Sequence, residues 1–237
     1  MEHIDQVKPV FDRHPEEEPR MPVPPAVIRR LPRYHRFLGD LLKAGKMRIS
    51  SSQLSKLMGV TASQIRQDLN CFGGFGQQGY GYNVRYLHGK ISELLGVNEG
   101  YRAVIVGAGN LGRALAATHM FERRGVARVA IFDNNPALIG KEIYGMKVRS
   151  VDELSDFCRR EKVAIGVLTV PKAAAYEIAH MMAQAGVRGI WNFANMELAL
   201  PDDNVIVENI HLGDSLMTLC YDIKTETAEG RFGDEDL

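Results

Sequence analysis

Residues 103–112 read Ala-Val-Ile-Val-Gly-Ala-Gly-Asn-Leu-Gly, a short apolar run that leads directly into a G-x-G-x-x-G motif. Helix-favouring residues follow the motif, and Asp133 comes 21 positions after Gly112, at the end of the next apolar run. A strand, a glycine-rich turn, a helix and a later acidic residue are the parts of a dinucleotide-binding βαβ unit. We therefore expect a Rossmann-like domain built around this motif.

Each part of the motif has an expected role in holding a dinucleotide. Gly107 permits the tight turn, Gly109 lets the backbone approach a pyrophosphate, and Gly112 lets the helix pack closely on the strand. Asp133 would accept hydrogen bonds from the ribose hydroxyls and repel a 2′-phosphate, which favours NAD(H) over NADP(H). The alternative is a turn that binds another nucleotide-like ligand, or none. The predicted cofactor contacts here are Gly107, Ala108, Gly109, Asn110, Leu111, Gly112 and Asp133.

Apolar runs alternate with helical stretches throughout the region that follows Tyr101. The expected strands are 103–106, 129–132, 163–170, 189–193 and 205–207, and the expected helices are 111–124, 151–160 and 173–185. Near-continuous apolar strands separated by helices predict an α/β fold with a parallel sheet covered on both faces. Loops at the carboxyl ends of such strands border the ligand crevice. We therefore add Thr169, Pro171, Asn192 and Phe193 as predicted cofactor contacts, with ordinary loop residues as the alternative.

A different pattern precedes this domain. Apolar residues recur at near-helical spacing over 24–42, and Pro32 predicts a kink or a restart of the helix. Residues 50–53 (Ser-Ser-Ser-Gln) and 61–64 (Thr-Ala-Ser-Gln) both read as capping boxes, with the turn Gly59-Val60 between the two short helices. This spacing predicts a helix-turn-helix. The glycine-rich, aromatic stretch 72–84 predicts a β-hairpin, and 85–95 a further helix, which completes a winged helix-turn-helix.

The net charge of zero conceals an uneven distribution along the chain. Residues 1–19 carry 2 Lys/Arg against 6 Asp/Glu, residues 20–90 carry 12 against 2, and residues 91–237 carry 15 against 21. One strongly basic block in an otherwise acidic chain indicates a nucleic-acid-binding module, the alternative being a solvated basic surface. The basic block coincides with the predicted winged helix, so we expect double-stranded DNA as its partner.

The second helix of the motif is the expected base-reading element. Ile65 and Leu69 would face inward, which turns a short polar face outward. Gln and Asn side chains suit adenine, Arg suits guanine, and other cations would contact phosphates. The hairpin tip would enter a minor groove; stacking of its aromatics on single strands is the less favoured alternative. The predicted DNA contacts are Lys46, Arg48, Lys56, Ser63, Gln64, Arg66, Gln67, Asn70, Gln77, Gln78 and Tyr80.

Several classes of protein are disfavoured by composition. The sequence contains no apolar run near the ~20 residues that a membrane span needs, and its acidic, proline-bearing N-terminus lacks the apolar core of a secretory signal, which predicts a cytoplasmic protein. Three widely spaced cysteines suit neither a disulfide framework nor a metal site. We expect a disordered tail over 1–22, a DNA-binding domain over 23–98, a Rossmann domain over 99–210, and a dimerisation helix with an acidic tail over 211–237.

Five motifs in order give this chain its family resemblance. They are VTASQIRQDL with the following FGGFGQQGYGY, then VGAGNLGRAL, LTVPKAAA, GIWNFA and VENIHL, within residues 24–222. In this order they resemble the Rex family of redox-sensing transcriptional repressors. The resemblance implies a homodimer whose C-terminal helix is swapped onto the partner. It also implies binding to palindromic operators when NADH is scarce and release from DNA when NADH binds.

The sequence departs from the family pattern at a few positions. Gln77-Gln78 stand where the family's hairpin tip commonly carries a basic residue, and Gln67 stands where its recognition helix often has Lys or Arg. Asn195 follows Asn-Phe-Ala where the family has Pro, and His211 stands where an Asp pairs with an Arg that matches Arg36.

An NAD-dependent oxidoreductase with an N-terminal appendage is the main alternative function. Such an enzyme needs a proton donor or acceptor held beside its substrate by a partner group. The candidates His88, His119, His180 and His211 are scattered, and the segment after the Rossmann core is too short for a substrate domain. A third alternative is a scaffold without a cofactor, or a CoA-binding module of the same fold. We therefore expect a regulator that is not an enzyme.

Overall fold

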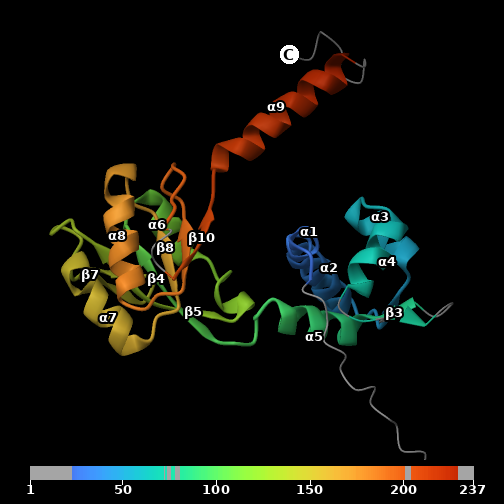
Figure 1. Cartoon of the computed structure of the whole chain (residues 1–237), viewed down its shortest axis with the longest axis horizontal. Helices are drawn as coiled ribbons and strands as arrows, with labels where there is room; N and C mark the ends of the chain where they lie inside the picture. The colour runs from blue at the N-terminus through green and yellow to red at the C-terminus, as the bar shows by residue number, and fades with distance from the viewer. Residues whose placement is uncertain (1–22, 72, 74–75, 78–80, 201–203, 229–237) are drawn as a thin grey trace, which may run out of the picture. The chain divides into compact units, whose positions relative to one another are not determined.

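The computed structural model describes residues 23–71, 73, 76–77, 81–200 and 204–228 (Figure 1). The predicted disordered tail, 1–22, lies outside these residues, as does the acidic tail from 229 onward. The chain divides into two compact units, one ending at Leu95 and the other beginning at Gly96. Each unit has a hydrophobic core of its own.

The N-terminal unit is a winged helix-turn-helix. Its described elements are α1 (Pro25–Ile28), α2 (Leu31–Lys43), β1 (Arg48–Ile49), α3 (Ser51–Met58), α4 (Ala62–Asn70), β2 (Gly76–Gln77), β3 (Gly81–Asn83) and α5 (Val84–Leu94). Strand β3 lies between β1 and β2 and is antiparallel to both. Pro32 falls in the first turn of α2, so the helix restarts there as expected. The inward faces of α3 and α4 bury Leu54, Ile65 and Leu69 in one core.

Side-chain caps fix the start of both helices of the helix-turn-helix. Ser50 Oγ accepts a hydrogen bond from the Gln53 amide (3.1 Å), and Gln53 Oε1 accepts one from the Ser50 amide (3.0 Å), which confirms the first capping box. Thr61 caps α4 through the Gln64 amide (3.1 Å). The reciprocal half of the second capping box was predicted wrongly, because the Gln64 side chain instead donates to Asp68 (2.8 Å).

The C-terminal unit is an α/β domain around a seven-stranded sheet, within the described residues. The strands are β4 (Tyr101–Val106), β5 (Val126–Asp133), β6 (Glu142–Ile143), β7 (Met146–Ser150), β8 (Ile165–Leu168), β9 (Gly189–Asn192) and β10 (Ile206–Asn209). Their order is β10-β9-β8-β4-β5-β7-β6, and all neighbours are parallel except β6 and β7. From β4 the chain adds β5 and β7 on one side of the sheet, and later adds β8, β9 and β10 on the other side. The strand order therefore reverses between β4 and β8.

Helices cover both faces of this sheet, as the apolar strands require. The remaining elements are α6 (Asn110–Ala117), η1 (Glu122–Arg124), η2 (Val151–Glu153), α7 (Leu154–Glu161), α8 (Lys172–Gln184) and α9 (Leu212–Ala228). Val104 and Val106 of β4 pack in the core with α7 and α8, whereas Ile105 packs on the opposite face with Ala116 of α6. This alternation follows from the two-residue period of a strand.

Two helices expected in this unit were wrong in detail, and one hairpin was not expected. The helix expected over 111–124 ends at Ala117, because Thr118 takes an extended conformation, and a short 3-10 turn follows at η1. The helix expected over 151–160 begins instead as the 3-10 turn η2. The hairpin β6–β7 was not predicted; its turn places Tyr144 (φ +48°) and Gly145 (φ +76°) in the left-handed region, as a two-residue hairpin turn requires.

Helix α9 follows β10 (Figure 1). Its large apolar side chains are exposed to solvent. The exposed apolar side chains of α9 are Leu212, Leu216, Met217, Leu219, Tyr221 and Ile223. Single exposed apolar residues are common on folded proteins, but a helix that buries none of its large apolar residues within its own chain is not. The helix therefore has a contact surface that this chain alone does not cover.

Candidate functional site

The three glycines of the G-x-G-x-x-G motif differ in what surrounds them. A Cβ on Gly112 would lie 1.9 Å from the Gly107 carbonyl oxygen, and one on Gly107, where φ is +104°, would lie 2.5 Å from the Thr169 carbonyl oxygen. Both positions are closed to a side chain by neighbouring backbone. Gly109 is exposed, and a Cβ there would meet nothing within 4 Å. The packing of the protein therefore requires Gly107 and Gly112, whereas the space beside Gly109 is open.

The N-terminus of α6 has hydrogen-bond donors to offer an anion. Its N-cap is Gly109, and no side chain caps this helix, whereas Ser50, Thr61 and Asn83 cap α3, α4 and α5. The first amides of an α-helix have no partner within the helix, and the helix dipole favours negative charge there. An uncapped helix start beside a glycine that leaves open space is suited to a pyrophosphate.

Asp133 lies at the carboxyl end of β5, as predicted from the sequence. Its Oδ2 accepts a hydrogen bond from the Ala108 amide (2.6 Å), and its Oδ1 accepts one from the Asn135 amide (2.8 Å). Each carboxylate oxygen keeps a second lone pair for a hydroxyl donor. The acidic side chain and the glycine-rich turn are thus brought together as the motif predicts.

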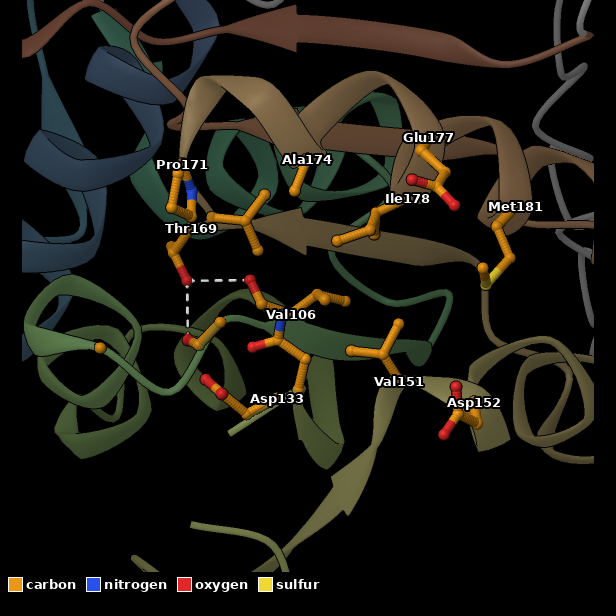
Figure 2. Close-up of a pocket in the computed structure, with 14 residues that line it drawn as sticks. Val106, Asp133, Val151, Asp152, Thr169, Pro171, Ala174, Glu177, Ile178 and Met181 are labelled. Atoms are coloured by element: carbon orange, nitrogen blue, oxygen red, sulfur yellow. Dashed lines mark hydrogen bonds between the residues drawn. The ribbon is translucent and has the colours of Figure 1, made fainter. Parts of the chain in front are cut away.

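A cavity of about 590 Å³ opens at this edge of the sheet, between α8 and the ends of β4 and β5 (Figure 2). It is bordered by Gly107, Gly109, Asp133, Thr169 and Pro171. Thr169 Oγ1 donates to the Val106 and Gly107 carbonyls (3.0 and 2.9 Å), which fastens the loop after β8 to the glycine-rich turn. The size falls within the range of small-molecule sites.

The apolar part of this cavity was not predicted from the sequence. Val151 lies opposite Ala174, Ile178 and Met181 of α8, and the carboxylates of Asp152 and Glu177 lie at the far end (Figure 2). The three α8 residues follow the i, i+4, i+7 spacing of one helix face, which the sequence could not distinguish from a core-facing stripe. An apolar slot next to the Asp133 carboxylate is suited to a flat aromatic base.

Asn192 and Phe193, also predicted as cofactor contacts, do not border this cavity. The Asn192 side chain is buried, and it donates to Met196 O (3.0 Å) and Asn209 Oδ1 (2.8 Å) while its Oδ1 accepts from the Ala194 amide (2.9 Å). Most of its bonding capacity is therefore used within the protein. Phe193 packs edge-to-face on Trp191, with ring centroids 4.6 Å apart.

Helix α4 presents the polar face that was predicted to read DNA. Its exposed side chains include Ser63, Arg66, Gln67 and Asn70, whereas Gln64 is half-buried. Lys46, Arg48 and Lys56 are exposed; the first two precede α3, and Lys56 lies in its last turn. Arg66 Nη1 also donates to Ser51 Oγ (3.2 Å), which links α4 to α3. Gln77 lies in β2, and Gln78 and Tyr80 lie outside the described residues.

A buried carboxylate holds α4 against the rest of the unit. Asp68 is 1 % exposed, and Arg30 binds it through two bonds, Nε to Oδ2 (2.7 Å) and Nη2 to Oδ1 (2.6 Å). The Tyr34 hydroxyl donates to Oδ2 (2.9 Å), and Gln64 Nε2 donates to Oδ1 (2.8 Å). Burial raises the pKa of Asp68, but the hydrogen bonds from Arg30, Gln64 and Tyr34 outweigh burial and lower it overall.

The described part of the chain has neither a metal site nor a membrane-spanning helix. It contains no group of three or more His, Cys, Asp or Glu side chains placed to hold a metal ion. None of its helices is both long and apolar enough to cross a membrane. The three cysteines are free thiols, and burial raises the pKa of Cys158 to about 11.

Comparison with known protein families matches both units. The family described as "CoA binding domain" matches residues 98–196, and the family described as "Putative DNA-binding protein N-terminus" matches residues 22–70. A redox-sensing transcriptional repressor Rex from Clostridium botulinum (strain Alaska E43) is 51 % identical over 198 residues, covering 84 % of this chain and 94 % of that protein. The Rex of Thermoanaerobacter sp. (strain X514) is 52 % identical over 201 residues, covering 85 % and 89 %.

Solved structures agree with the sequence relatives. The repressor RSP in complex with β-NAD⁺ and operator DNA superposes with a TM-score of 0.81 at 51 % identity, covering 89 % of this chain and 97 % of that one. RSP in complex with β-NADH gives the same TM-score at 47 % identity, covering 89 % and 98 %. These relatives are transcriptional repressors, which rejects the oxidoreductase alternative. The chain belongs to the Rex family of redox-sensing transcriptional repressors.

Proposed function

We propose that the protein represses transcription by binding a palindromic operator and releases it when NADH binds. The main support for NADH binding is the open space at Gly109, beside the uncapped start of α6. The other two glycines of this turn are enclosed by neighbouring backbone. The relatives add support, because RSP is described in complexes with β-NAD⁺, β-NADH and operator DNA.

The proposed cofactor site follows the crevice from the turn to the cavity. The pyrophosphate lies on the amides of Asn110, Leu111 and Gly112 at the start of α6, and Asp133 accepts hydrogen bonds from the adenosine ribose. The adenine enters the apolar slot between Val151 and α8. Gly107, Ala108, Gly109, Thr169 and Pro171 complete this part of the site. Asn192 and Phe193, at the carboxyl end of β9, remain proposed contacts on the nicotinamide side.

The redox preference has a simple electrostatic basis. The nicotinamide ring of NAD⁺ carries a positive charge that the ring of NADH lacks. Transferring a charged ring from water into an apolar site costs more free energy than transferring a neutral one. Because Phe193, which follows β9, packs on the ring of Trp191 in that strand, we expect the neutral reduced ring to bind more tightly. To release DNA, NADH must also bind the DNA-free state of the protein more tightly than the DNA-bound state, because only a difference in affinity between two states can shift their populations.

The proposed DNA surface is the exposed face of α4 with its flanking cations. Ser63, Gln64, Arg66, Gln67 and Asn70 would reach base edges in the major groove. Lys46, Arg48 and Lys56 would contact phosphates, and the wing residues Gln77, Gln78 and Tyr80 would contact the minor groove. A palindromic operator has two half-sites, so the repressor acts as a homodimer. We propose that the uncovered apolar face of α9 docks onto a second copy of the chain by a helix swap, and that the protein acts in the cytoplasm.

Anisotropy of a labelled operator duplex tests this function directly. The protein is bound to the duplex at one fixed ionic strength, and NADH and then NAD⁺ are titrated in separate runs. We expect NADH to release the DNA and NAD⁺ to have little effect. Gln67→Ala should weaken operator binding by about 1–3 kcal/mol if Gln67 contacts a base, with Ser52→Ala, at an exposed polar residue of α3, as the matched surface control.

CoA is the informative control ligand, because one matching family carries its name. CoA has a 3′-phosphate on its adenosine ribose, where Asp133 favours free hydroxyls. Release of DNA by CoA but not by NADH would overturn the proposed ligand. Firm operator binding that is indifferent to NADH, NAD⁺ and CoA would leave a repressor that senses something else.

A further inference from the structure

A continuous chain of side-chain hydrogen bonds runs from the end of β9 to the residue before α9. Asn192 Nδ2 donates to Asn209 Oδ1 (2.8 Å), and Asn209 Nδ2 donates to Glu197 Oε2 (2.9 Å). The other oxygen, Glu197 Oε1, lies 2.9 Å from His211 Nε2, and α9 begins at Leu212. Two adjacent strand ends and the root of the terminal helix are therefore joined by side chains.

Asn209 is the central member of this chain, and its amide has a fixed orientation. Its Oδ1 also accepts from the Leu198 amide (3.1 Å), and its Nδ2 also donates to the Leu198 carbonyl (3.1 Å). Reversing the amide would place its donors against the Leu198 amide and its acceptor against the Leu198 carbonyl and the Glu197 carboxylate. The four bonds therefore specify one position for Asn209, between β9 and the loop that precedes β10.

Asn192 connects the same chain to the residue that follows Phe193. Its Oδ1 accepts from the Ala194 amide (2.9 Å), and its backbone carbonyl accepts from the Ile210 amide (2.8 Å). A displacement of the segment after β9 must therefore either break these bonds or move residues 209–211 with it. This segment ends at the same sheet edge as the glycine-rich turn and Asp133, because β9 is parallel to β8, β4 and β5.

The outer end of the chain contributes little to stability by itself. The Glu197 side chain is 79 % exposed and that of His211 is 24 % exposed, and exposed ion pairs have small effects on unfolding. A contact of this kind can nevertheless restrict the direction in which α9 leaves β10. Experiments can therefore separate its effect on the direction of α9 from its effect on the stability of the fold.

We propose that Asn209 is a positioning residue that transmits the state of the segment after β9 to the root of α9. This proposal rests on the proposed function, because it assigns the nicotinamide side of the crevice to that segment. It deepens that function by naming the connection through which nucleotide binding reaches the helix that joins two copies of the chain. Asn209 itself borders no part of the described cavity.

The test is the coupling between NADH and operator DNA, measured as the ratio of operator Kd with saturating NADH to operator Kd without nucleotide. Allosteric couplings commonly amount to about 5–150-fold. In Asn209→Ala we expect this ratio to fall at least about threefold, because the variant loses part of that coupling, while operator Kd without nucleotide changes by less than that. Asn195→Ala, an exposed asparagine of the same loop, is the matched control and should keep the wild-type ratio.

Glu197→Gln provides a second variant that does not disturb the core, since its side chain is exposed. It removes the charge opposite His211 and should lower the ratio in the same direction. Amide hydrogen exchange at residues 210–214, without nucleotide, gives an independent readout and should be faster in both variants than in Asn195→Ala.

The possible results distinguish this proposal from the proposed function. If the wild-type protein shows no NADH-dependent release, the proposed function fails first. If the wild type releases DNA and both Asn209→Ala and Glu197→Gln keep its coupling ratio, the function stands and the positioning role of Asn209 is refuted. If Asn209→Ala is poorly folded, Glu197→Gln decides, and an unchanged ratio in that variant refutes the role.

Discussion

Asp68→Ala is expected to destabilise the N-terminal unit by about 2–4 kcal/mol and to abolish operator binding at moderate protein concentration. The substitution leaves the buried Tyr34 hydroxyl without its acceptor and Arg30 without its carboxylate. Removing one partner of a buried ion pair typically costs about 3–5 kcal/mol, and Arg30 is partly exposed, which places the expected cost lower. Urea unfolding of wild type and variant, followed by circular dichroism, measures the difference.

Asp40→Ala is the matched control for this experiment. Asp40 is also an aspartate with a cationic partner, Lys43 at 3.3 Å, but both side chains are exposed. Its removal should change stability by no more than about 0.5 kcal/mol. A cost below 1 kcal/mol for Asp68→Ala would contradict the view that this carboxylate holds α4 in place.

The Asp68 carboxylate should also make the free energy of unfolding depend on pH in the acidic range. Its pKa is lower in the folded protein than in the unfolded chain, so the unfolded state binds the proton more tightly. The stabilisation is complete above the unfolded pKa, at about 3.9 for Asp, and is lost as the pH falls from there through the folded pKa. The difference in stability between wild type and Asp68→Ala should therefore narrow over that acidic window.

Gly109→Val is expected to reduce NADH affinity at least 100-fold, or about 2.7 kcal/mol, while leaving the fold intact. Position 109 has an ordinary φ of −71°, and a Cβ there meets nothing within 4 Å, so we expect the fold to accept a side chain. The added methyl groups would occupy the space that a pyrophosphate needs above the start of α6. Titration of NADH fluorescence measures affinity, and thermal unfolding, with a shift of only a few degrees expected, checks the fold.

Gly112→Ala is the contrasting variant in the same motif. Its Cβ would lie 1.9 Å from the Gly107 carbonyl oxygen, which belongs to rigid backbone, so we expect the α/β unit to unfold or lose much of its stability. Together, the two variants test whether Gly109 is needed for ligand binding and Gly112 for packing. If a folded Gly109→Val protein bound NADH with unchanged affinity, the proposal that the pyrophosphate binds at this turn would be wrong.

The parts of the protein that the sequence predicted best are those specified by neighbouring residues. The glycine-rich turn, Asp133 and the Ser50 capping box all depend on contacts within short segments or on a fixed strand–turn–helix order. Asp68 was not foreseen, because its partner Arg30 lies 38 positions away and a charged residue on a short helix reads as exposed. The apolar slot formed by Ile178 and Met181 was missed for a related reason, since only the tertiary arrangement shows that part of α8 faces a cavity.

Element ends were less predictable than element types. Thr118 ends α6 early by taking an extended conformation, although the residues beyond it still read as helical. The left-handed Tyr144 that opens the β6–β7 turn is a conformation that non-glycine residues seldom adopt, so the sequence gives little warning of it.

The exposed apolar face of α9 also has a genetic consequence. If every chain needs a second copy to cover that face, then a cell that expresses both an intact allele and one with a damaged α4 will assemble mixed pairs. In such a dimer one α4 can bind its operator half-site and the other cannot. With equal expression and random pairing, only about a quarter of the dimers are fully intact. Alleles that alter α4 but preserve α9 should therefore be dominant negative, whereas alleles that delete α9 should be recessive.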